Sequence, residues 1–401
     1  MRVVGSLVAA AAALVVAGCG GGEPARDTRA ATTAQTPAPA PSATAPAAAK
    51  ESPAPAPQVV MVRRAGGVPP GWGERLRRID GVTAVTRATR AQAMLRATTP
   101  AVGRTRAVRA GFAVPLDTLV VRPGGYAAML PVAERRVVRR LGAGRALLSR
   151  TSARLRHARA GATITLTGGR RLRVVGVLDD GLVRSAELVV SAAEGARLGP
   201  RAPYLLAAVR TERTARRAER AFDAPRTRVS ALGPAPWGVR GRIARPAELK
   251  ARFGEFALRL PVGTDWVTID PAWVRRNIVS RRMPILGNVT CHRRMIAPLR
   301  RALSEVVRRR LSRLIDPGDY AGCYAPRRIP ASGTLSLHAW GLALDVNASR
   351  NPQGSPPNQD RRLVRIMERH GFSWGGRWPT LPDGMHFEFH GNGPPQTDEP
   401  F

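Results

Sequence analysis

Two short segments near the C-terminus alternate apolar and polar side chains with the period of a β-strand. In residues 341–347 three aliphatic side chains share one face, so Asp345 lies on the other. In residues 386–389 two phenylalanines share one face, and His386 and Glu388 share the other. On each strand, residues of the types that bind metals therefore lie on the face opposite the apolar one. This arrangement predicts that the two polar faces line a cleft.

Histidine is concentrated in the same part of the chain. Five of the six histidines follow Cys291. Two of them, His338 and His386, can join Asp345 in holding one divalent metal. A catalytic zinc site needs three such nitrogen and oxygen ligands and one coordination position left for water. A second carboxylate, Asp383, stands three residues before the last imidazole, where it is placed to act on that water.

These residues form a recognisable pattern. Residues 336–345 read Ser-x-His-x-x-Gly-x-Ala-x-Asp, and Asp-x-x-His follows at 383–386, preceded by Trp-Gly-Gly-Arg-Trp at 374–378. The pattern resembles the zinc D-alanyl-D-alanine carboxypeptidase family, which includes VanY-like enzymes and the L-alanyl-D-glutamate endopeptidases of bacterial cell walls. The resemblance runs from about residue 245 to about residue 389.

The resemblance implies roles for the polar residues. It implies that His338, Asp345 and His386 bind Zn²⁺ and that Asp383 is the general base. Many family members carry glutamate where this chain has the shorter Asp383. Glu388 is the alternative base, because it shares the strand face of His386. The preferred interpretation of Glu388 is a partner that orients a metal ligand.

Further residues are candidates for contact with the substrate. Arg327 stands where relatives carry an arginine ahead of the Ser-x-His segment, and a guanidinium there would bind a substrate carboxylate or the oxyanion formed by attack on a peptide carbonyl. Arg328 is adjacent, so the sequence leaves open which of the two faces the substrate. Ser336 and Trp378 are candidates for holding the substrate or the zinc-site residues.

The resemblance therefore implies a zinc metallopeptidase that hydrolyses peptidoglycan stem peptides by means of an activated water. The sequence does not distinguish a carboxypeptidase from a related endopeptidase. The alternative is a catalytically inactive wall-binding or sensor lipoprotein that keeps the peptidase fold.

The N-terminus predicts the compartment. Residues 1–18 have a short basic start and an apolar run too short to span a membrane, which is typical of a signal peptide. The run ends in Val-Ala-Gly-Cys19, the small-residue pattern of a bacterial lipoprotein. We expect Cys19 to carry lipid and to anchor an exported protein to the outer face of the cytoplasmic membrane.

The two remaining cysteines, Cys291 and Cys323, form an even pair. In an oxidising compartment they can form a disulfide. Two free buried thiols are the other state that the sequence allows.

The sequence predicts an α+β fold in several parts. After the signal peptide, residues 19–57 form an Ala/Pro/Thr-rich tether, expected to be disordered. Residues 58–232 form an α+β domain of unknown role, in which 146–177 weakly resembles the extracytoplasmic domains of ABC-type permeases. Residues 240–401 form the zinc peptidase domain with a small antiparallel sheet.

Three local elements are specific enough to test. Residues 162–175 predict a hairpin with a two-glycine turn. The apolar spacing over 297–315 predicts a long amphipathic helix that ends at Asp-Pro-Gly. Residues 360–370 predict a shorter helix with Asp360 as its N-cap.

The net charge of +36 is carried almost entirely by arginine. For an exported protein the expected partners of such a surface are anionic lipids or wall polymers. Nucleic acid is not expected as a partner, because the arginines are spread along the chain without a nucleic-acid motif. A general preference for arginine over lysine is the other explanation.

Overall fold

The computed structural model describes residues 55–64, 66–199, 201–237, 246–330, 333–378 and 381–391, which belong to one compact unit. The expected signal peptide, Cys19 and nearly all of the tether lie outside the described residues, as does the segment 238–245 between the two expected domains. None of the described helices combines the length and the apolar character needed to span a membrane.

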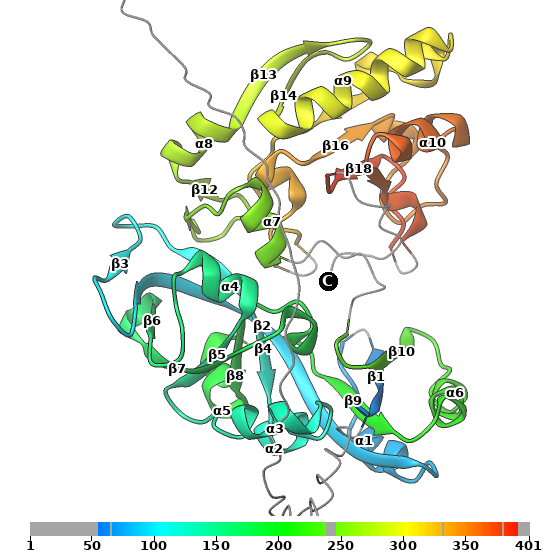
Figure 1. The fold of residues 1–401 in the computed structure, drawn as a ribbon. Coiled ribbons are helices and arrows are strands. Elements are labelled where there is room, and N and C mark those ends of the chain that lie inside the picture. The colour runs from blue at the N-terminus through cyan, green and yellow to red at the C-terminus, as the bar shows by residue number, and fades with distance from the viewer. Residues whose placement is uncertain are drawn as a thin grey trace, which may run out of the picture. The chain divides into compact units, whose positions relative to one another are not determined.

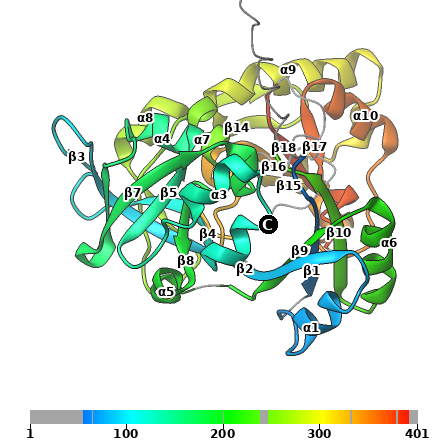
Figure 2. The ribbon, with the colours of Figure 1, turned by 60° about the horizontal axis from the view of Figure 1, so that its bottom comes forward.

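Residues 58–234 are built on one ten-stranded sheet with the order β10-β1-β9-β2-β4-β8-β5-β7-β6, and β3 pairs with β2. Strand β2 also pairs with β6, so the pairings from β2 through β4, β8, β5, β7 and β6 close into a ring. Figure 2 shows the long β2 passing from β9 toward β4. The strands are β1 (Gln58–Arg64), β2 (Val82–Thr99), β3 (Arg106–Ala107), β4 (Val114–Val121), β5 (Arg145–Ser149), β6 (Thr163–Leu166), β7 (Arg171–Leu178), β8 (Leu188–Ser191), β9 (Tyr204–Val209) and β10 (Thr227–Pro234).

The helices of this region are short and lie between the strands in sequence. They are α1 (Trp72–Arg77), α2 (Pro123–Ala127), α3 (Val132–Val138), α4 (Arg150–Leu155), α5 (Ala192–Gly195) and α6 (Glu212–Ala221). The predicted hairpin is present as β6 and β7. Its turn is one residue longer than predicted, because Leu166 N–H bonds to the Arg170 carbonyl and leaves Thr167–Gly169 as the turn.

The C-terminal region carries a small antiparallel sheet with the order β15-β16-β18-β17. Figure 1 shows β16 and β18 in orange and red below the hairpin β13–β14 and helix α9. Its elements are α7 (Pro246–Phe253), β11 (Leu258–Arg259), β12 (Thr268–Ile269), α8 (Pro271–Asn277), β13 (Ile278–Met283), β14 (Gly287–His292), α9 (Arg293–Arg308), β15 (Tyr320–Gly322), β16 (Ala343–Val346), α10 (Arg361–Arg369), β17 (Phe372–Trp374) and β18 (His386–Phe389). The α+β fold class and the small C-terminal antiparallel sheet are thus confirmed.

Helix α9 differs from its predicted range. It begins four residues earlier, because the His292 imidazole accepts a hydrogen bond from Arg294 N–H and caps the helix. It ends at Arg308, because Arg310 adopts a positive φ of 55° and breaks the helical repeat. A single 3₁₀ turn, Ser312–Leu314, follows the helix. The apolar residues of this segment lie outside α9 but still pack against the core: Leu311, Leu314 and Ile315. Helix α10 follows the prediction, with Asp360 capping its first turn.

Candidate metal centre

The register of β16 and β18 places two of the predicted ligands opposite each other. Asp345 pairs with His386, and Ala343 pairs with Glu388. Directly opposed residues of antiparallel strands have their Cβ atoms only about 5 Å apart. The aliphatic and aromatic residues of the other face are buried in the core, as the alternation predicts: Leu342, Leu344, Val346, Phe387 and Phe389.

The third predicted ligand comes from a single 3₁₀ turn, Leu337–Trp340, just before β16. Ser336 begins this turn, because its hydroxyl accepts a hydrogen bond from His338 N–H at 3.2 Å. Gly341 ends the turn with φ 65°, and a Cβ there would lie 2.7 Å from the backbone nitrogen of His292. Glycine therefore lets the turn approach β14 closely and fixes where His338 emerges.

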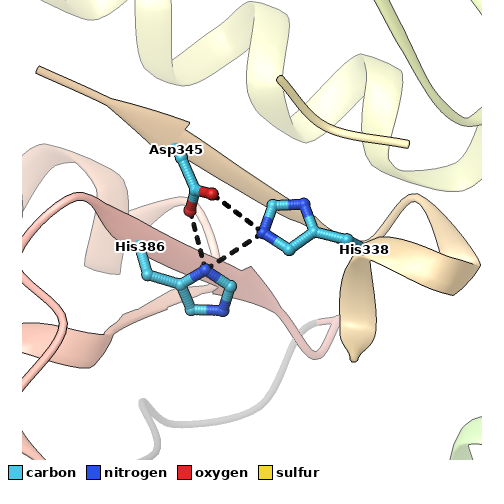
Figure 3. A group of neighbouring side chains, drawn as sticks. All are labelled: His338, Asp345 and His386. Atoms are coloured by element: carbon cyan, nitrogen blue, oxygen red, sulfur yellow. Dashed lines mark hydrogen bonds and ion pairs between the residues drawn. The ribbon is translucent and has the colours of Figure 1, made fainter. Parts of the chain in front are cut away.

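The three side chains converge on one point, as Figure 3 shows. His338 Nε2 lies 3.2 Å from His386 Nδ1 and 3.1 Å from Asp345 Oδ2, and His386 Nδ1 lies 2.8 Å from Asp345 Oδ1. All three residues are at least nine-tenths buried. The structure thus brings together the set that the sequence predicted as zinc ligands.

The far side of each imidazole has its own hydrogen-bond partner. His338 Nδ1 lies 2.7 Å from the Cys323 carbonyl oxygen, which can only accept, so Nδ1 carries the proton. His386 Nε2 lies 3.1 Å from Glu388 Oε1, which fixes a proton on Nε2 in the same way. In their neutral forms the two rings therefore present lone pairs to each other, and Asp345 adds a carboxylate to them.

The electrostatics of the cluster favour a positive charge at this point. Burial alone raises the pKa of Asp345, but the positive charge of His386 and the close contacts with both imidazoles, when these are protonated, outweigh burial and hold that pKa well below its usual range. Burial lowers the pKa of His386, yet Asp345 and Glu388 raise it well above its usual value. Glu388 is also buried, and its bonds to His386 and His390 lower its pKa to about 2.

Asp383 lies beside this cluster. A Cβ added to Gly375 would meet the Asp383 and His386 Cβ atoms at 3.2 and 3.3 Å, so these three residues crowd together. Gln353 Nε2 donates to Asp383 Oδ2 at 3.0 Å, whereas the buried Oδ1 has no hydrogen-bond partner among the described residues. Burial, assisted by the Asp345 charge, raises the pKa of Asp383 against the lowering effect of His386.

The two neighbouring arginines have different surroundings. The Arg328 guanidinium donates to the Thr264 carbonyl at 3.0 Å and pairs with Asp265 at 3.4 Å. The Arg327 backbone bridges to Trp266, and its carbonyl accepts from Ser336 N–H at 3.1 Å. Arg328 is therefore engaged away from the cluster, and the role of Arg327 stays a prediction.

One of the tryptophans contacts the cluster directly. The Trp378 ring packs on the His386 imidazole, with 5.4 Å between centroids. Trp374 is core, and its indole N–H donates to the Gly384 carbonyl. Trp340 packs against Phe256 in the core, with 4.5 Å between the ring centroids and the rings tilted by 49°.

The structure joins Cys291 and Cys323 in a disulfide. It also shows three contributors that the sequence analysis did not identify: the Cys323 carbonyl, Gln353, and His390, whose Nε2 lies 3.2 Å from Glu388. The sequence carried no signal for the first two, because a backbone carbonyl and an exposed loop glutamine belong to no motif. For His390 the signal was the strand alternation that continues from 386 and 388.

Comparison with known proteins supports a peptidase. Residues 330–389 match the family model described as D-alanyl-D-alanine carboxypeptidase. The match covers the candidate metal centre and supports, at a coarse level, a peptidase of the cell-wall type. It is narrower than the predicted extent from about residue 245, and the finer likeness to VanY-like enzymes stays a prediction. No curated protein matches the chain significantly.

Several solved structures resemble the chain weakly. The periplasmic region of MacB from Actinobacillus actinomycetemcomitans aligns with a TM-score of 0.28 and 10% identity, over 43% of this chain and 88% of that one. The extracellular domain of the noncanonic ABC-type transporter YknZ from Gram-positive bacteria aligns with a TM-score of 0.29 and 12% identity, over 43% of this chain and 99% of that one. A domain of a permease protein from Porphyromonas gingivalis aligns with a TM-score of 0.28 and 14% identity, over 48% of this chain and 95% of that one. At TM-scores this low the likeness supports no inference about function.

Proposed function

We propose that this protein is a zinc-dependent peptidase that hydrolyses peptidoglycan stem peptides. One observation carries the proposal: His338 Nε2 and His386 Nδ1 face each other at 3.2 Å, and both rings are oriented by acceptors on their far sides. When both rings are neutral, their lone pairs and the Asp345 carboxylate repel each other unless a positive charge lies among them. That charge is a metal ion or, in its place, the proton that the raised pKa of His386 favours. Two nitrogens and a carboxylate oxygen are also the donor set that catalytic zinc prefers, so the residues fit the metal.

The chain's own residues divide the chemistry among them. His338, Asp345 and His386 would hold the zinc, which supplies Lewis acidity toward a water and a peptide carbonyl when bound. Asp383 accepts the proton of the attacking water through Oδ1, the oxygen that Gln353 does not occupy, and delivers it to the leaving amine. Arg327 stabilises the negative charge that develops on the carbonyl oxygen, or binds the substrate's terminal carboxylate.

The substrate class rests on the match of residues 330–389 to D-alanyl-D-alanine carboxypeptidases. The test is incubation of purified muropeptides with the wild type, followed by mass spectrometry, which reports the activity and the bond that is cut. Asp383→Ala is the matched variant, because Asp383 is not among the three proposed ligands.

We expect the wild type to shorten the peptides and Asp383→Ala to bind zinc but to lose about 10²- to 10⁴-fold in rate. A chelator should stop the wild type, and added zinc should restore it. If both proteins bind zinc and leave every peptide intact, the protein is an inactive wall binder and the proposal fails.

We also propose that the protein is exported and anchored through a lipidated Cys19; this proposal rests on the sequence of residues 1–19. Such an anchor would place the peptidase beside its polymer. Metabolic labelling with a clickable fatty acid should mark the wild type and not Cys19→Ala. Equal labelling of the two proteins contradicts the anchor.

A further inference from the structure

The disulfide between Cys291 and Cys323 lies next to the ligand His338. Both cysteines are buried, with exposed fractions of 0% and 3%. The carbonyl oxygen of Cys323 accepts the hydrogen bond from His338 Nδ1 at 2.7 Å. The residue that fixes the His338 tautomer is therefore itself half of a covalent cross-link.

The short segment around Cys323 contacts two of the three proposed ligands. Gly322, at the end of β15, pairs with Asp345 across the sheet. Ala325 N–H donates to the His338 carbonyl at 3.0 Å, which adds a second bond between this segment and the turn that carries the ligand. A shift of this segment would thus move the surroundings of His338 and Asp345 together.

The segment is tied to β14, and β14 is tied to the turn that carries His338. Tyr324 N–H bonds to the Thr290 carbonyl at 3.0 Å, beside the disulfide to Cys291. His292 N–H bonds to the Gly341 carbonyl at 2.9 Å, and a Cβ on Gly341 would come within 3.1 Å of the Cys291 carbonyl carbon. Three chain segments therefore meet at the disulfide, and one of them carries the ligand.

We propose that the Cys291–Cys323 disulfide is a positioning element for the zinc ligand His338, so that the cross-linked protein binds zinc more tightly than the protein without the cross-link. This inference rests on the proposed function. Without the bond, the Cys323 carbonyl is held only by short backbone pairings, and the imidazole can exchange its tautomer and its rotamer. Outer hydrogen-bond partners of metal-binding histidines typically contribute 10- to 100-fold to metal affinity.

The test compares the wild type with the double variant C291A/C323A. Alanine is chosen because free thiolates would themselves bind zinc. Zinc affinity is measured by competition with a chromophoric chelator, and we expect a loss of about 10- to 100-fold. Val289→Ala is the matched control, because it removes buried volume from the same strand without touching the disulfide, and its affinity should change by less than about twofold.

A second readout separates positioning from general loosening. Nitrogen-15 spectra of the histidine rings, recorded without zinc, should show a single Nδ1-protonated tautomer for His338 in the wild type and a mixture in the double variant. If the double variant does not fold, the same spectra are taken on the wild type before and after a dithiol reduces the disulfide to two thiols.

The two failures are distinguishable. Unchanged zinc affinity in the folded double variant, or a single unchanged His338 tautomer after loss of the cross-link, overturns the inference and leaves the proposed function intact. A wild type that binds no zinc at these residues overturns the proposed function instead.

Discussion

Glu388 connects two histidines, and only one of them is a proposed zinc ligand. Its Oε1 lies 3.1 Å from His386 Nε2, and its Oε2 lies 3.2 Å from His390 Nε2. The carboxylate is 3% exposed, so these contacts replace water. A buried carboxylate on the far nitrogen of a metal-binding imidazole orients the ring and increases its basicity.

We therefore expect Glu388→Ala to lower zinc affinity by about 10- to 100-fold, measured by chelator competition. Glu305→Ala is the control, because Glu305 also bonds a histidine but lies outside the metal centre. Equal zinc affinity in the wild type and Glu388→Ala would show that the contact does not orient His386. It would leave the alternative role of Glu388 as a base to be tested by kinetics.

At this scale the sequence predicted the side chains that carry a motif and missed the groups that do not. Strand alternation places Asp345 and His386 away from the apolar core, and His338 could be selected because it belongs to the Ser-x-His-x-x-Gly-x-Ala-x-Asp pattern that carries the family resemblance. Gln353 could not, because its contact with Asp383 depends on how a loop returns to the sheet.

At the scale of elements, Glu305 joins the two C-terminal helices. It lies in α9 and accepts from Arg309 at 2.7 Å, from Arg369 at 2.5 Å and from His370 at 2.8 Å, the last two at the end of α10. Burial raises the pKa of Glu305, but these bonds outweigh burial and lower that pKa from 4.5 to about 2.

The lowered pKa makes a prediction about acid stability. Because the folded pKa lies below the unfolded one, the ionised Glu305 stabilises the fold above about pH 4.5, and this stabilisation is lost as the pH falls toward 2. Glu305→Gln should therefore be less stable than the wild type at neutral pH and should lose less stability between pH 5 and about 2. Denaturant titrations across this range check it, and parallel pH profiles of the two proteins would contradict it.

Elements with strong local signals were predicted, and elements defined by distant contacts were not. Helix α10 was predicted from a capping Asp360 and an apolar stripe. Strand β2, 18 residues long, was not predicted, because its buried face is largely alanine and threonine and shows little hydrophobic contrast. Its length comes from pairing with four other strands, which a local pattern cannot show.

At the scale of the whole molecule, one buried lysine stands out in a chain that contains only two. Lys250 of α7 lies 2.7 Å from Glu187, which precedes β8. Arg156, the residue that follows α4, lies 3.0 Å from the same carboxylate. The side chains of all three are at most 2% exposed. Glu255 also pairs with Arg156 at 2.7 Å and with Lys250 at 3.7 Å, so two carboxylates balance the two buried cations. The cluster ties the large sheet to the first helix of the C-terminal region.

Removing that charge should destabilise the protein strongly. We expect Glu187→Gln to lower the free energy of unfolding by about 3–5 kcal/mol, because Glu255 alone is then left to balance two buried cations. The exposed pair of Glu212 and Arg216 gives the control, and Glu212→Gln should change stability by less than about 0.5 kcal/mol. Similar losses for the two variants in urea titrations would contradict the account.

We propose that His338, Asp345 and His386 hold one zinc ion, and the roles of the other residues depend on that ion. Anomalous diffraction at the zinc edge from crystals of the zinc-loaded protein tests it most directly. We expect one peak within about 2.0–2.2 Å of His338 Nε2, His386 Nδ1 and an Asp345 carboxylate oxygen. The absence of a peak at this point, or zinc bound only at other histidines, would contradict it.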